Sequence, residues 1–320
     1  MVDGAGRVVW WNGNLVPEKE ARLSIYDEAL MYGSMVFEMT RSFNKVQFKL
    51  TEHIDRLFQS AKYLRIDIPF SRKDVIQSCL DTIEANEPFF NDDDEHRLMI
   101  NVTRGLLGIY QGIDVENKGP NIIIADFPLR WTVQGMGKLF DSGVNAVVPS
   151  QRTIPANLLE PKVKNRSRIH YLMANIEVGQ YKGNNNWALL LDPDGYIAEG
   201  TGSNFFIVKD GYLITPEPRN ILRGISRQYV MSLKPSCEKN IELYDVINAD
   251  EAFYTGTPFC VLPVTSINGI PIGNGKIGNI TQEILKIWSQ NVGVDIVKQI
   301  KKWDKNTKET GVTPYAFTNR

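Results

Sequence analysis

The alternation of apolar and polar residues predicts strands, and apolar residues spaced three and four apart predict helices. In the first half of the chain we expect strands at residues 8–11, 14–17, 35–43, 46–50, 98–103 and 121–126. The first two flank an Asn-Gly pair and form a hairpin. One helix is expected from Thr51, as its N-cap, to about residue 64, and another over residues 72–85.

The second half has the same mixture. Strands are expected at residues 144–149, 187–191 and 196–197, with two more in a hairpin that turns at residues 210–211. Helices are expected from Ser167, as N-cap, to about residue 181, and over residues 225–234 and 280–291. The polar tail, 301–320, is expected to be partly disordered.

The length of 320 residues favours two domains over one. Composition changes at a stretch that carries two glycines. We therefore place a small N-terminal domain at 1–131, a linker at 132–138 and a larger C-terminal domain at 139–320. Because strands and helices occur in both halves, the predicted fold is a two-lobed α/β or α+β structure.

Composition narrows the class of protein. Apolar residues make up 42% of the chain, and 36 basic residues nearly balance 37 acidic ones, which argues against a nucleic-acid binder or a polybasic membrane-surface protein. The N-terminus lacks a long apolar stretch, and no run of about 18 apolar residues occurs. The three cysteines and three histidines show no disulfide or metal-ligand spacing. We expect a cytoplasmic protein without a metal.

The most informative stretch runs from Glu199 to Arg227. It reads Glu, a short gap, Asn204, an apolar-aromatic pair, a hairpin, Thr215, and then apolar-x-Gly-apolar-x-Arg. This pattern resembles the signature of the class IV aminotransferases, which use pyridoxal 5'-phosphate (PLP). The resemblance covers roughly residues 32–264 and implies a fold type IV, D-amino acid aminotransferase-like structure with PLP as cofactor.

PLP enzymes need an amine that binds the cofactor and moves a proton. Branched-chain members of the family typically place a Tyr five residues after this lysine, and counting back from Tyr171 gives Arg166, whose guanidinium stays protonated. In D-amino-acid transaminases and aminodeoxychorismate lyases an Ala follows the lysine by ten residues and a Glu by thirteen, and Lys164 fits that spacing. The resemblance therefore favours Lys164 as the catalytic amine, with Lys162 as the alternative.

The resemblance also assigns the acid and the phosphate ligands. It places Glu199 at the pyridine nitrogen of PLP, where a charge-assisted hydrogen bond keeps the ring protonated, and it gives Asn204 a scaffold role. Arg56 stands in a His-x-x-Arg-Leu motif suited to bidentate phosphate contact. The other expected phosphate ligands lie at a helix start or in a Thr-Gly-Thr loop: Gly224, Ile225, Ser226, Gly256 and Thr257.

The segment from Tyr32 to Arg41 resembles the Tyr-Gly-x-x-x-Phe-Glu-Gly-x-Arg strand of the branched-chain group. The resemblance implies that Tyr32 and Phe37 line an apolar pocket for the substrate side chain, and that Arg41 belongs to the same substrate-binding strand. One departure concerns Met39, which replaces the glycine of that strand and could crowd the pocket.

The residues that bind the substrate carboxylate stay open. Pro258 follows Thr257 where the branched-chain group has a main-chain N–H, and proline has none. The Arg-x-His pair typical of D-amino-acid transaminases is also absent from the segment after Arg104. Arg97 and Arg104 are therefore the candidate ligands for the carboxylate.

Together these resemblances imply a homodimeric aminotransferase that acts by a ping-pong Schiff-base mechanism. It would move an amino group from an amino acid, with a branched-chain donor favoured, to a 2-oxo acid. Three alternatives remain. The chain could be a D-amino acid or (R)-amine transaminase, or a PLP lyase resembling aminodeoxychorismate lyase. It could also be a PLP-fold protein without catalysis, which an arginine at the amine position would favour.

Overall fold

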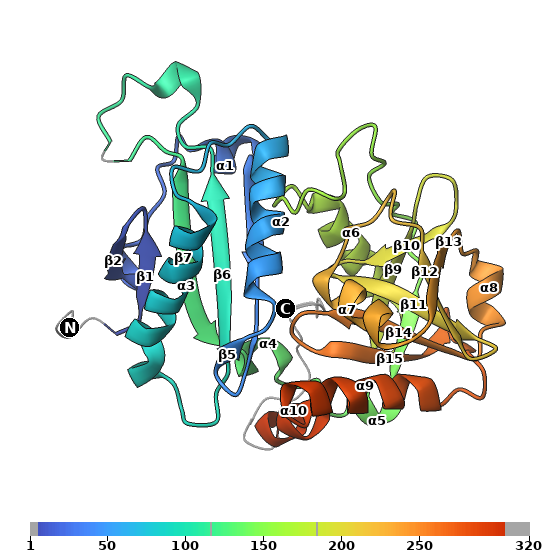
Figure 1. Cartoon of the computed structure of the whole chain (residues 1–320). Helices are drawn as coiled ribbons and strands as arrows, with labels where there is room; N and C mark the ends of the chain where they lie inside the picture. The colour runs from blue at the N-terminus through green and yellow to red at the C-terminus, as the bar shows by residue number, and fades with distance from the viewer. Residues whose placement is uncertain (1–5, 116, 184, 305–320) are drawn as a thin grey trace. The chain divides into compact units, whose positions relative to one another are not determined.

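The computed structural model describes residues 6–115, 117–183 and 185–304 (Figure 1). Its contacts divide the chain into two compact units. The first comprises Met1–Leu129 and Val163–Ser167, and the second comprises Arg130–Lys162 and Arg168–Arg320. The predicted linker, 132–138, falls within the second unit, and a short segment that carries Lys164 returns to the first.

The first unit is built on a five-stranded antiparallel sheet in the order β2-β1-β7-β6-β3. Its strands are β1 (Val8–Trp11), β2 (Asn14–Pro17), β3 (Met35–Met39), β6 (His96–Thr103) and β7 (Asn121–Pro128). Helices α2 (Leu50–Tyr63) and α3 (Arg72–Asn86) cover one face of this sheet (Figure 1). The shorter elements are η1 (Glu18–Glu20), α1 (Glu28–Tyr32), β4 (Ser42–Phe43), β5 (Val46–Gln47), η2 (Glu87–Phe89) and η3 (Gly108–Tyr110).

Residue alternation along β6 separates the two faces of the first sheet. Alternate residues of β6 join the two helices in one apolar core, which includes Ile54, Leu57, Val75, Leu98, Ile100 and Val102. Burying one such side chain stabilises the fold by about 1.5–3 kcal/mol. Arg97 and Asn101, which alternate with the core residues, therefore belong to the face that α2 and α3 do not cover. We call this the open face of the first sheet.

The second unit is built on a nine-stranded mixed sheet in the order β10-β9-β8-β15-β14-β11-β12-β13, with β16 beside β15. The β8–β9, β8–β15 and β12–β13 pairs are parallel, and the other pairs are antiparallel. The strands are β8 (Val144–Val147), β9 (Asn186–Leu191), β10 (Ile197–Gly200), β11 (Ser203–Lys209), β12 (Tyr212–Pro216), β13 (Ser236–Lys239), β14 (Glu251–Gly256), β15 (Cys260–Ile267) and β16 (Ile270–Pro271).

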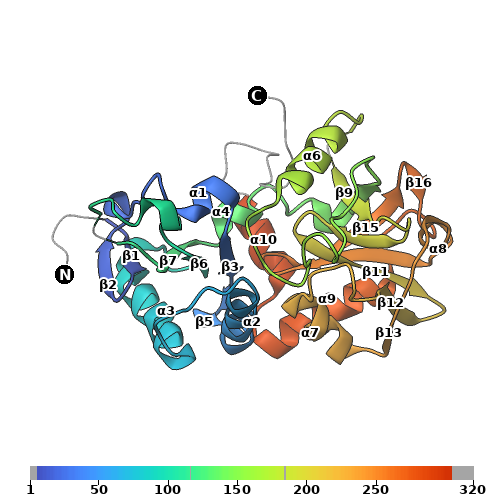
Figure 2. The same cartoon turned by 90° about the horizontal axis from the view of Figure 1, so that it is seen from above.

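Helices lie on both sides of the second sheet. They are α4 (Arg130–Val133), α5 (Leu139–Ser142), α6 (Ile169–Val178), α7 (Ile225–Leu233), α8 (Leu243–Ile247), α9 (Asn279–Val292) and α10 (Ile296–Asp304). Figure 2 shows α6 on one side and α7 with α9 on the other. Helix α6 packs on β8 and β9 through Ala174 and Val178, and the ring of Tyr171 lies against the same small core. This packing fixes the position of Tyr171 within the second unit.

Most predicted elements are confirmed, but two predicted N-caps are wrong. Helix α2 begins one residue before Thr51, after Lys49, which adopts a left-handed conformation with φ of 56°. Helix α6 begins after Arg168. The hydroxyl of Ser167 instead donates to the carbonyl of Tyr32 at 3.2 Å. Ser and Thr hydroxyls can bond to backbone groups outside a cap, so their presence alone does not fix where a helix begins.

The predicted strand 35–43 is divided in the structure, because β3 ends at Met39 and β4 pairs with β5. The buried Glu95 carboxylate stabilises the separate hairpin. It accepts hydrogen bonds from the Ser42 hydroxyl at 2.5 Å and from the main-chain N–H groups of Asn44 and Lys45.

Only the first four residues of the predicted polar tail lie in the structure, as the end of α10. The remainder, 305–320, lies outside the described residues. No helix within the described part of the chain has the length and apolar character that crossing a membrane requires.

Candidate active site

Lys164 lies in an extended segment beside the edge strand of the first sheet. The Lys164 carbonyl accepts a hydrogen bond from the N–H of Phe37 at 3.0 Å, and Asn165 forms a β-bridge with Val36. The N–H of Lys164 donates to the Ser60 hydroxyl of α2 at 3.2 Å. The backbone is thus held on both sides, and alternation along the segment directs the side chain of Lys164 toward the open face.

The side chains of Lys164 and Arg166 both contact the aromatic ring of Phe37 on this face. The ammonium nitrogen of Lys164 lies 4.8 Å from the ring centroid of Phe37, and the guanidinium carbon of Arg166 lies 3.6 Å from the same centroid. Arg166 also donates to the Asn101 side chain at 3.1 Å. Both are cation–π contacts. The structure therefore brings predicted residues Lys164 and Phe37 together and gives Arg166 a supporting position beside them.

Arg56 belongs to a buried network behind the same strand. Its Nε and Nη2 donate to the Glu38 carboxylate at 2.6 and 2.8 Å, and the Nδ1 of His53 contacts that carboxylate at 2.7 Å. Burial alone would raise the pKa of Glu38, but the charge of Arg56 and the hydrogen bond of His53 hold it well below its usual range. The bidentate contact fixes the plane of the Arg56 guanidinium.

The pKa of His53 is lowered in this network, which favours the neutral ring. Burial lowers its pKa, the Glu38 carboxylate opposes that shift, and the charges of Arg56 and Lys164 lower it further. Lys164 therefore lies close enough to the network for its charge to act on it. Among the described residues, no group of three or more His, Cys, Asp or Glu side chains could hold a metal ion.

Glu199 is the centre of a second cluster, within the second unit. It lies on β10 directly opposite Asn204 of β11, so the five-residue spacing in the sequence is the spacing of a hairpin pair. Its Oε2 accepts hydrogen bonds from the Asn204 side chain at 3.2 Å and from the N–H of Leu222 at 3.1 Å. Its Oε1 accepts a hydrogen bond from the Tyr171 hydroxyl at 2.6 Å. Glu199 itself is 4% exposed.

Tyr171 is the residue of this cluster that motif reasoning missed. It lies on α6, 28 positions before its partner, so no local pattern links the two. Its sequence signals are its place on the inward side of an amphipathic helix and its position in the branched-chain spacing, which points to the amine and not to Glu199.

Thr215 and Arg227, which end the signature, stabilise the hairpin. Arg227, 2% exposed, donates to the Thr215 hydroxyl at 3.3 Å, to the carbonyl of Pro216 at 3.0 Å and to Glu238 at 2.7 Å. Thr215 in turn donates to the carbonyl of Phe205 at 2.9 Å. Thr215 therefore links β12 to β11, the strand that carries Asn204, and Arg227 links α7 to β12 and β13.

The predicted phosphate ligands of the second unit lie at a helix start and at a strand end. Gly224 precedes α7 in an extended conformation, and a Cβ at this position would come within 2.0 Å of the Asn204 side-chain oxygen. Ile225 and Ser226 open the helix, where N–H groups lack intrahelical acceptors. Gly256 ends β14, where a Cβ would meet the ring of Phe259 at 2.8 Å.

One buried atom near the strand end fits an anionic ligand. Within the described residues, the Oγ1 of Thr255 is buried and has no hydrogen-bond partner. Buried polar groups are normally paired, and a phosphate oxygen would accept from this hydroxyl. The two glycines, the helix start and the orphaned hydroxyl fit the phosphate group that the sequence predicts.

The predicted substrate residues fall into different environments. Arg97 is 4% exposed; its Nη2 contacts the Met39 sulfur at 3.6 Å, and among the described residues its Nε and Nη1 lack hydrogen-bond partners. Arg41 is buried, donates to the carbonyl of Ser42 and lies against the ring of Phe43.

Two other predicted substrate residues lie outside the core. Tyr32 is 66% exposed. Arg104 donates to the carbonyl of Leu64 and pairs with Glu28 at 3.4 Å. These contacts leave Arg97 as the predicted arginine whose surroundings best fit an anion.

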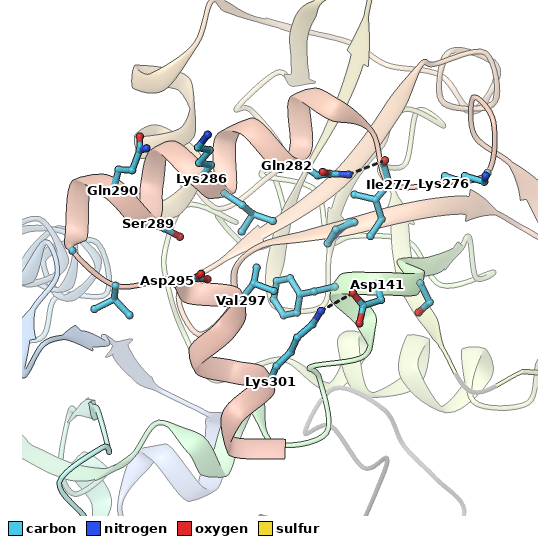
Figure 3. Close-up of a pocket in the computed structure, with 17 residues that line it drawn as sticks. Asp141, Lys276, Ile277, Gln282, Lys286, Ser289, Gln290, Asp295, Val297 and Lys301 are labelled. Atoms are coloured by element: carbon cyan, nitrogen blue, oxygen red, sulfur yellow. Dashed lines mark hydrogen bonds and ion pairs between the residues drawn. The ribbon is translucent and has the colours of Figure 1, made fainter. Parts of the chain in front are cut away.

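A separate groove of about 1140 Å³ lies on the second unit between α9, α10 and α5 (Figure 3). None of its lining residues is a predicted site residue. Several of its polar side chains have partners within the fold. Lys301 pairs with Asp141, Gln282 donates to the carbonyl of Ile277, and Asp295 accepts from the N–H of Lys298 at the start of α10. The groove is therefore the seam between packed helices rather than a second candidate site.

Comparison with known proteins identifies the family. The family model described as class IV amino-transferase matches residues 35–267. The chain belongs to the class IV aminotransferases. A Pseudomonas aeruginosa branched-chain-amino-acid aminotransferase is 31% identical over 298 residues, which cover 90% of this chain and 93% of that protein. A Methanocaldococcus jannaschii protein provisionally given the same name is 38% identical over 283 residues, 86% of this chain and 93% of its own length.

Solved structures agree with this assignment. An Escherichia coli branched-chain amino acid aminotransferase has a TM-score of 0.78 at 29% identity, covering 89% of this chain and 94% of its own. The PLP form of the Thermobaculum terrenum enzyme has a TM-score of 0.78 at 26% identity, covering 93% and 97%. The predicted fold type IV architecture, the PLP cofactor and the aminotransferase activity are confirmed. The substrates of this enzyme are an amino acid and a 2-oxo acid.

Proposed function

We propose that this aminotransferase takes its amino group from an amino acid with a branched apolar side chain. The observation that carries this proposal is the apolar surface beside Lys164, where the buried Phe37 ring lies 4.8 Å from the amine. Met39 and Met99, paired across β3 and β6, share that open face. These apolar side chains favour an apolar substrate side chain, and Arg166 and Arg97, which contact the Phe37 ring and the Met39 sulfur, add cations to the same face. The names of the relatives agree with this choice of donor.

Lys164 is the proposed catalytic amine. Its alternative, Lys162, forms an ion pair with Glu160 at 2.5 Å and donates to the carbonyl of Arg219. Bound PLP supplies an aldehyde that reacts with amines and a ring that draws electrons from the bond being broken. The Nζ of Lys164 moves a proton away from the α-carbon of the amino donor, and the reverse transfer serves the 2-oxo acid in the second half of the ping-pong cycle.

Glu199 is proposed to hold the proton at the ring nitrogen of the cofactor. Its three hydrogen-bond donors fix the carboxylate and favour its charged form. The proposed phosphate ligands are Arg56, Gly224, Ile225, Ser226, Gly256 and Thr257. The Glu38 carboxylate orients the Arg56 guanidinium. The first turn of α7 offers main-chain N–H groups to the phosphate.

Arg97 is proposed to bind a carboxylate of the substrates. A buried guanidinium with two nitrogens that lack partners among the described residues is costly unless an anion joins it. Tyr32, Arg41 and Arg104 remain predicted substrate residues, with the contacts described above.

The donor proposal is tested with a panel of amino donors against 2-oxoglutarate and pyruvate. We expect kcat/KM for leucine, isoleucine and valine to exceed that for alanine by at least about tenfold, because each extra buried methylene contributes roughly 0.8 kcal/mol. We also expect these L-amino acids to be better donors than D-amino acids and (R)-amines. Equal or higher activity with D-amino acids or (R)-amines would contradict the proposal. Formation of pyruvate from a substrate without an acceptor would indicate lyase activity.

The amine is tested by borohydride reduction of the PLP-loaded enzyme and peptide mapping. We expect the label on the peptide that carries Lys164, its loss in Lys164→Ala, and its retention in Lys162→Ala. Label at Lys162, or on another peptide, would move the catalytic amine while leaving the family assignment intact.

We also propose a cytoplasmic homodimer. Three apolar residues at helical spacing on α6 are exposed: Ile169 at 68%, Met173 at 49% and Ile176 at 42%. Apolar patches of this kind mark interaction surfaces, and a second copy of the chain would cover this one. We expect light scattering to give the mass of a dimer, and Ile169→Glu to shift it toward a monomer. The matched control is Tyr244→Glu, which replaces an exposed apolar side chain on α8.

A further inference from the structure

The contact between Tyr171 and Glu199 has a chemical consequence for the cofactor. The Tyr171 hydroxyl donates to Oε1 of Glu199 at 2.6 Å, a short distance typical of a hydrogen bond to a charged acceptor. The other carboxylate oxygen accepts from Asn204 and from the N–H of Leu222. Of these three donors, the phenol forms the shortest hydrogen bond.

The surroundings of Tyr171 keep its hydroxyl a donor. Burial raises its pKa, and the neighbouring charge of Glu199 raises it further. The charge of Arg168, whose guanidinium carbon lies 5.2 Å from the ring centroid, acts in the opposite direction and is outweighed. The ring of His170 lies against Tyr171 at 4.1 Å between centroids, and burial lowers the pKa of His170 to about 4, so His170 adds no positive charge near neutral pH. The Tyr171 hydroxyl therefore stays protonated near neutral pH.

A donor on a carboxylate stabilises the anion and makes it a weaker base. The proton between Glu199 and the ring nitrogen is divided according to the relative basicity of the two groups. We propose that Tyr171 is a positioning residue that keeps Glu199 the weaker base, so that the proton stays on the ring nitrogen of PLP. This inference rests on the proposed role of Glu199. It adds a residue of α6 that acts through Glu199 rather than by touching the cofactor.

The test replaces Tyr171 by Phe in the PLP-loaded enzyme, with an NMR-active isotope at the ring nitrogen of the cofactor. The ring of Phe keeps the packing on α6 and removes only the donor. We expect the ring-nitrogen signal to move toward the unprotonated position. We also expect kcat to fall about tenfold, the lower end of what loss of a hydrogen bond to a charged group produces, while KM for the 2-oxo acid stays within about twofold.

The matched control is Tyr254→Phe. Tyr254 is buried in the same unit and its hydroxyl contacts the carbonyl of Ala188 at 3.3 Å. Its removal should leave the ring-nitrogen signal in place. A second variant carries a fluorotyrosine at position 171, whose more acidic hydroxyl should move the signal further toward the protonated position without altering the fold. An equal shift in Tyr254→Phe, or no shift with either change at position 171, would overturn the inference.

Glu199→Gln separates this inference from the proposed role of Glu199. If Glu199→Gln leaves the ring-nitrogen signal unchanged, Glu199 is not the partner of the ring and both proposals fail. If Glu199→Gln moves the signal and Tyr171→Phe does not, only the inference about Tyr171 fails. In the double variant Tyr171→Phe should add no further shift, because its effect passes through the carboxylate.

Discussion

Glu38 and Glu199 are both buried glutamates that accept several hydrogen bonds, yet their surroundings differ. Glu38, in the first unit, is bound by the Arg56 guanidinium and by His53. Glu199, in the second unit, accepts from a phenol, a side-chain amide and a main-chain N–H. The cation beside Glu38 balances its charge within the fold. The phenol, amide and main-chain donors of Glu199 are uncharged and hold its carboxylate in place, which suits a group that must bind a protonated ring.

The largest expected effect is that of Glu199→Gln on catalysis. The substitution preserves shape and most hydrogen bonds but removes the charge that holds the proton at the cofactor ring. We expect kcat to fall by about 100- to 10,000-fold, the range for loss of a proton-handling group, with little change in the free energy of unfolding. Steady-state kinetics and thermal unfolding of the PLP-loaded enzyme check both parts. A fall in stability with kcat retained would make Glu199 a structural residue.

Glu38→Gln should have the opposite profile. Removing one partner of a buried ion pair costs about 3–5 kcal/mol of stability, because the remaining charge is left uncompensated. Arg56, whose side chain is 12% exposed, would lose the carboxylate that orients it. We expect a clear loss in denaturant unfolding and weaker PLP binding as a secondary result. Asp55→Asn, which breaks the exposed pair with Arg72, is the control and should change stability by less than about 1 kcal/mol. If Glu38→Gln and Asp55→Asn lost equal stability, the buried ion pair would contribute no more than the exposed one.

The difference between these two glutamates shows how far the sequence can be interpreted. The hairpin pair of Glu199 and Asn204 could be predicted, because five residues across a tight turn bring the two side chains together. The signature also predicts the start of α7 after Gly224, and the structure explains the glycine, because a Cβ there would come within 2.0 Å of the Asn204 side-chain oxygen. Local spacing carries this information.

Long-range partners could not be predicted in the same way. Tyr171 lies 28 residues before Glu199, and Glu38 lies 18 residues before Arg56. Each pair meets only because a helix packs on a sheet in a particular register, which depends on side-chain packing across elements. The division of the predicted strand 35–43 has a similar origin, because Glu95, from a distant part of the chain, stabilises the separate hairpin.

A smaller effect, on PLP binding, is expected for Gly224→Ala. Gly224 lies between the proposed phosphate ligands at the start of α7 and Asn204, the partner of Glu199. The added methyl would come within 2.0 Å of the Asn204 side-chain oxygen, so Asn204 must shift away from Glu199 and Leu222. We expect the Kd for PLP to rise about tenfold, equivalent to roughly 1.4 kcal/mol. Gly108→Ala is the control, because a Cβ there meets no atom within 4 Å. Titration of the PLP-free protein with PLP measures both, and an unchanged Kd for Gly224→Ala would separate Gly224 from the phosphate site.

The smallest expected effect is the acid sensitivity that Glu38 gives to the first unit. The pKa of Glu38 is lower in the folded chain than its ordinary value of 4.5, so its contribution to stability is present above that value and is lost as the pH falls below it. One group of this kind changes the free energy of unfolding by at most about 1.4 kcal/mol per pH unit. We expect denaturant unfolding to show a decline in stability from about pH 5 downward, and Glu38→Gln to reduce the slope of that decline while lowering the plateau. Glu52→Gln is the control. Partial burial would raise the pKa of Glu52, but the hydrogen bond that Lys49 donates lowers that pKa. Solvent screens this surface pair, so its removal should reduce the slope less than Glu38→Gln does. If the slope in Glu38→Gln matched that of the unaltered chain, the acid sensitivity would belong to other carboxylates, and Arg56 would not depend on the charge of Glu38.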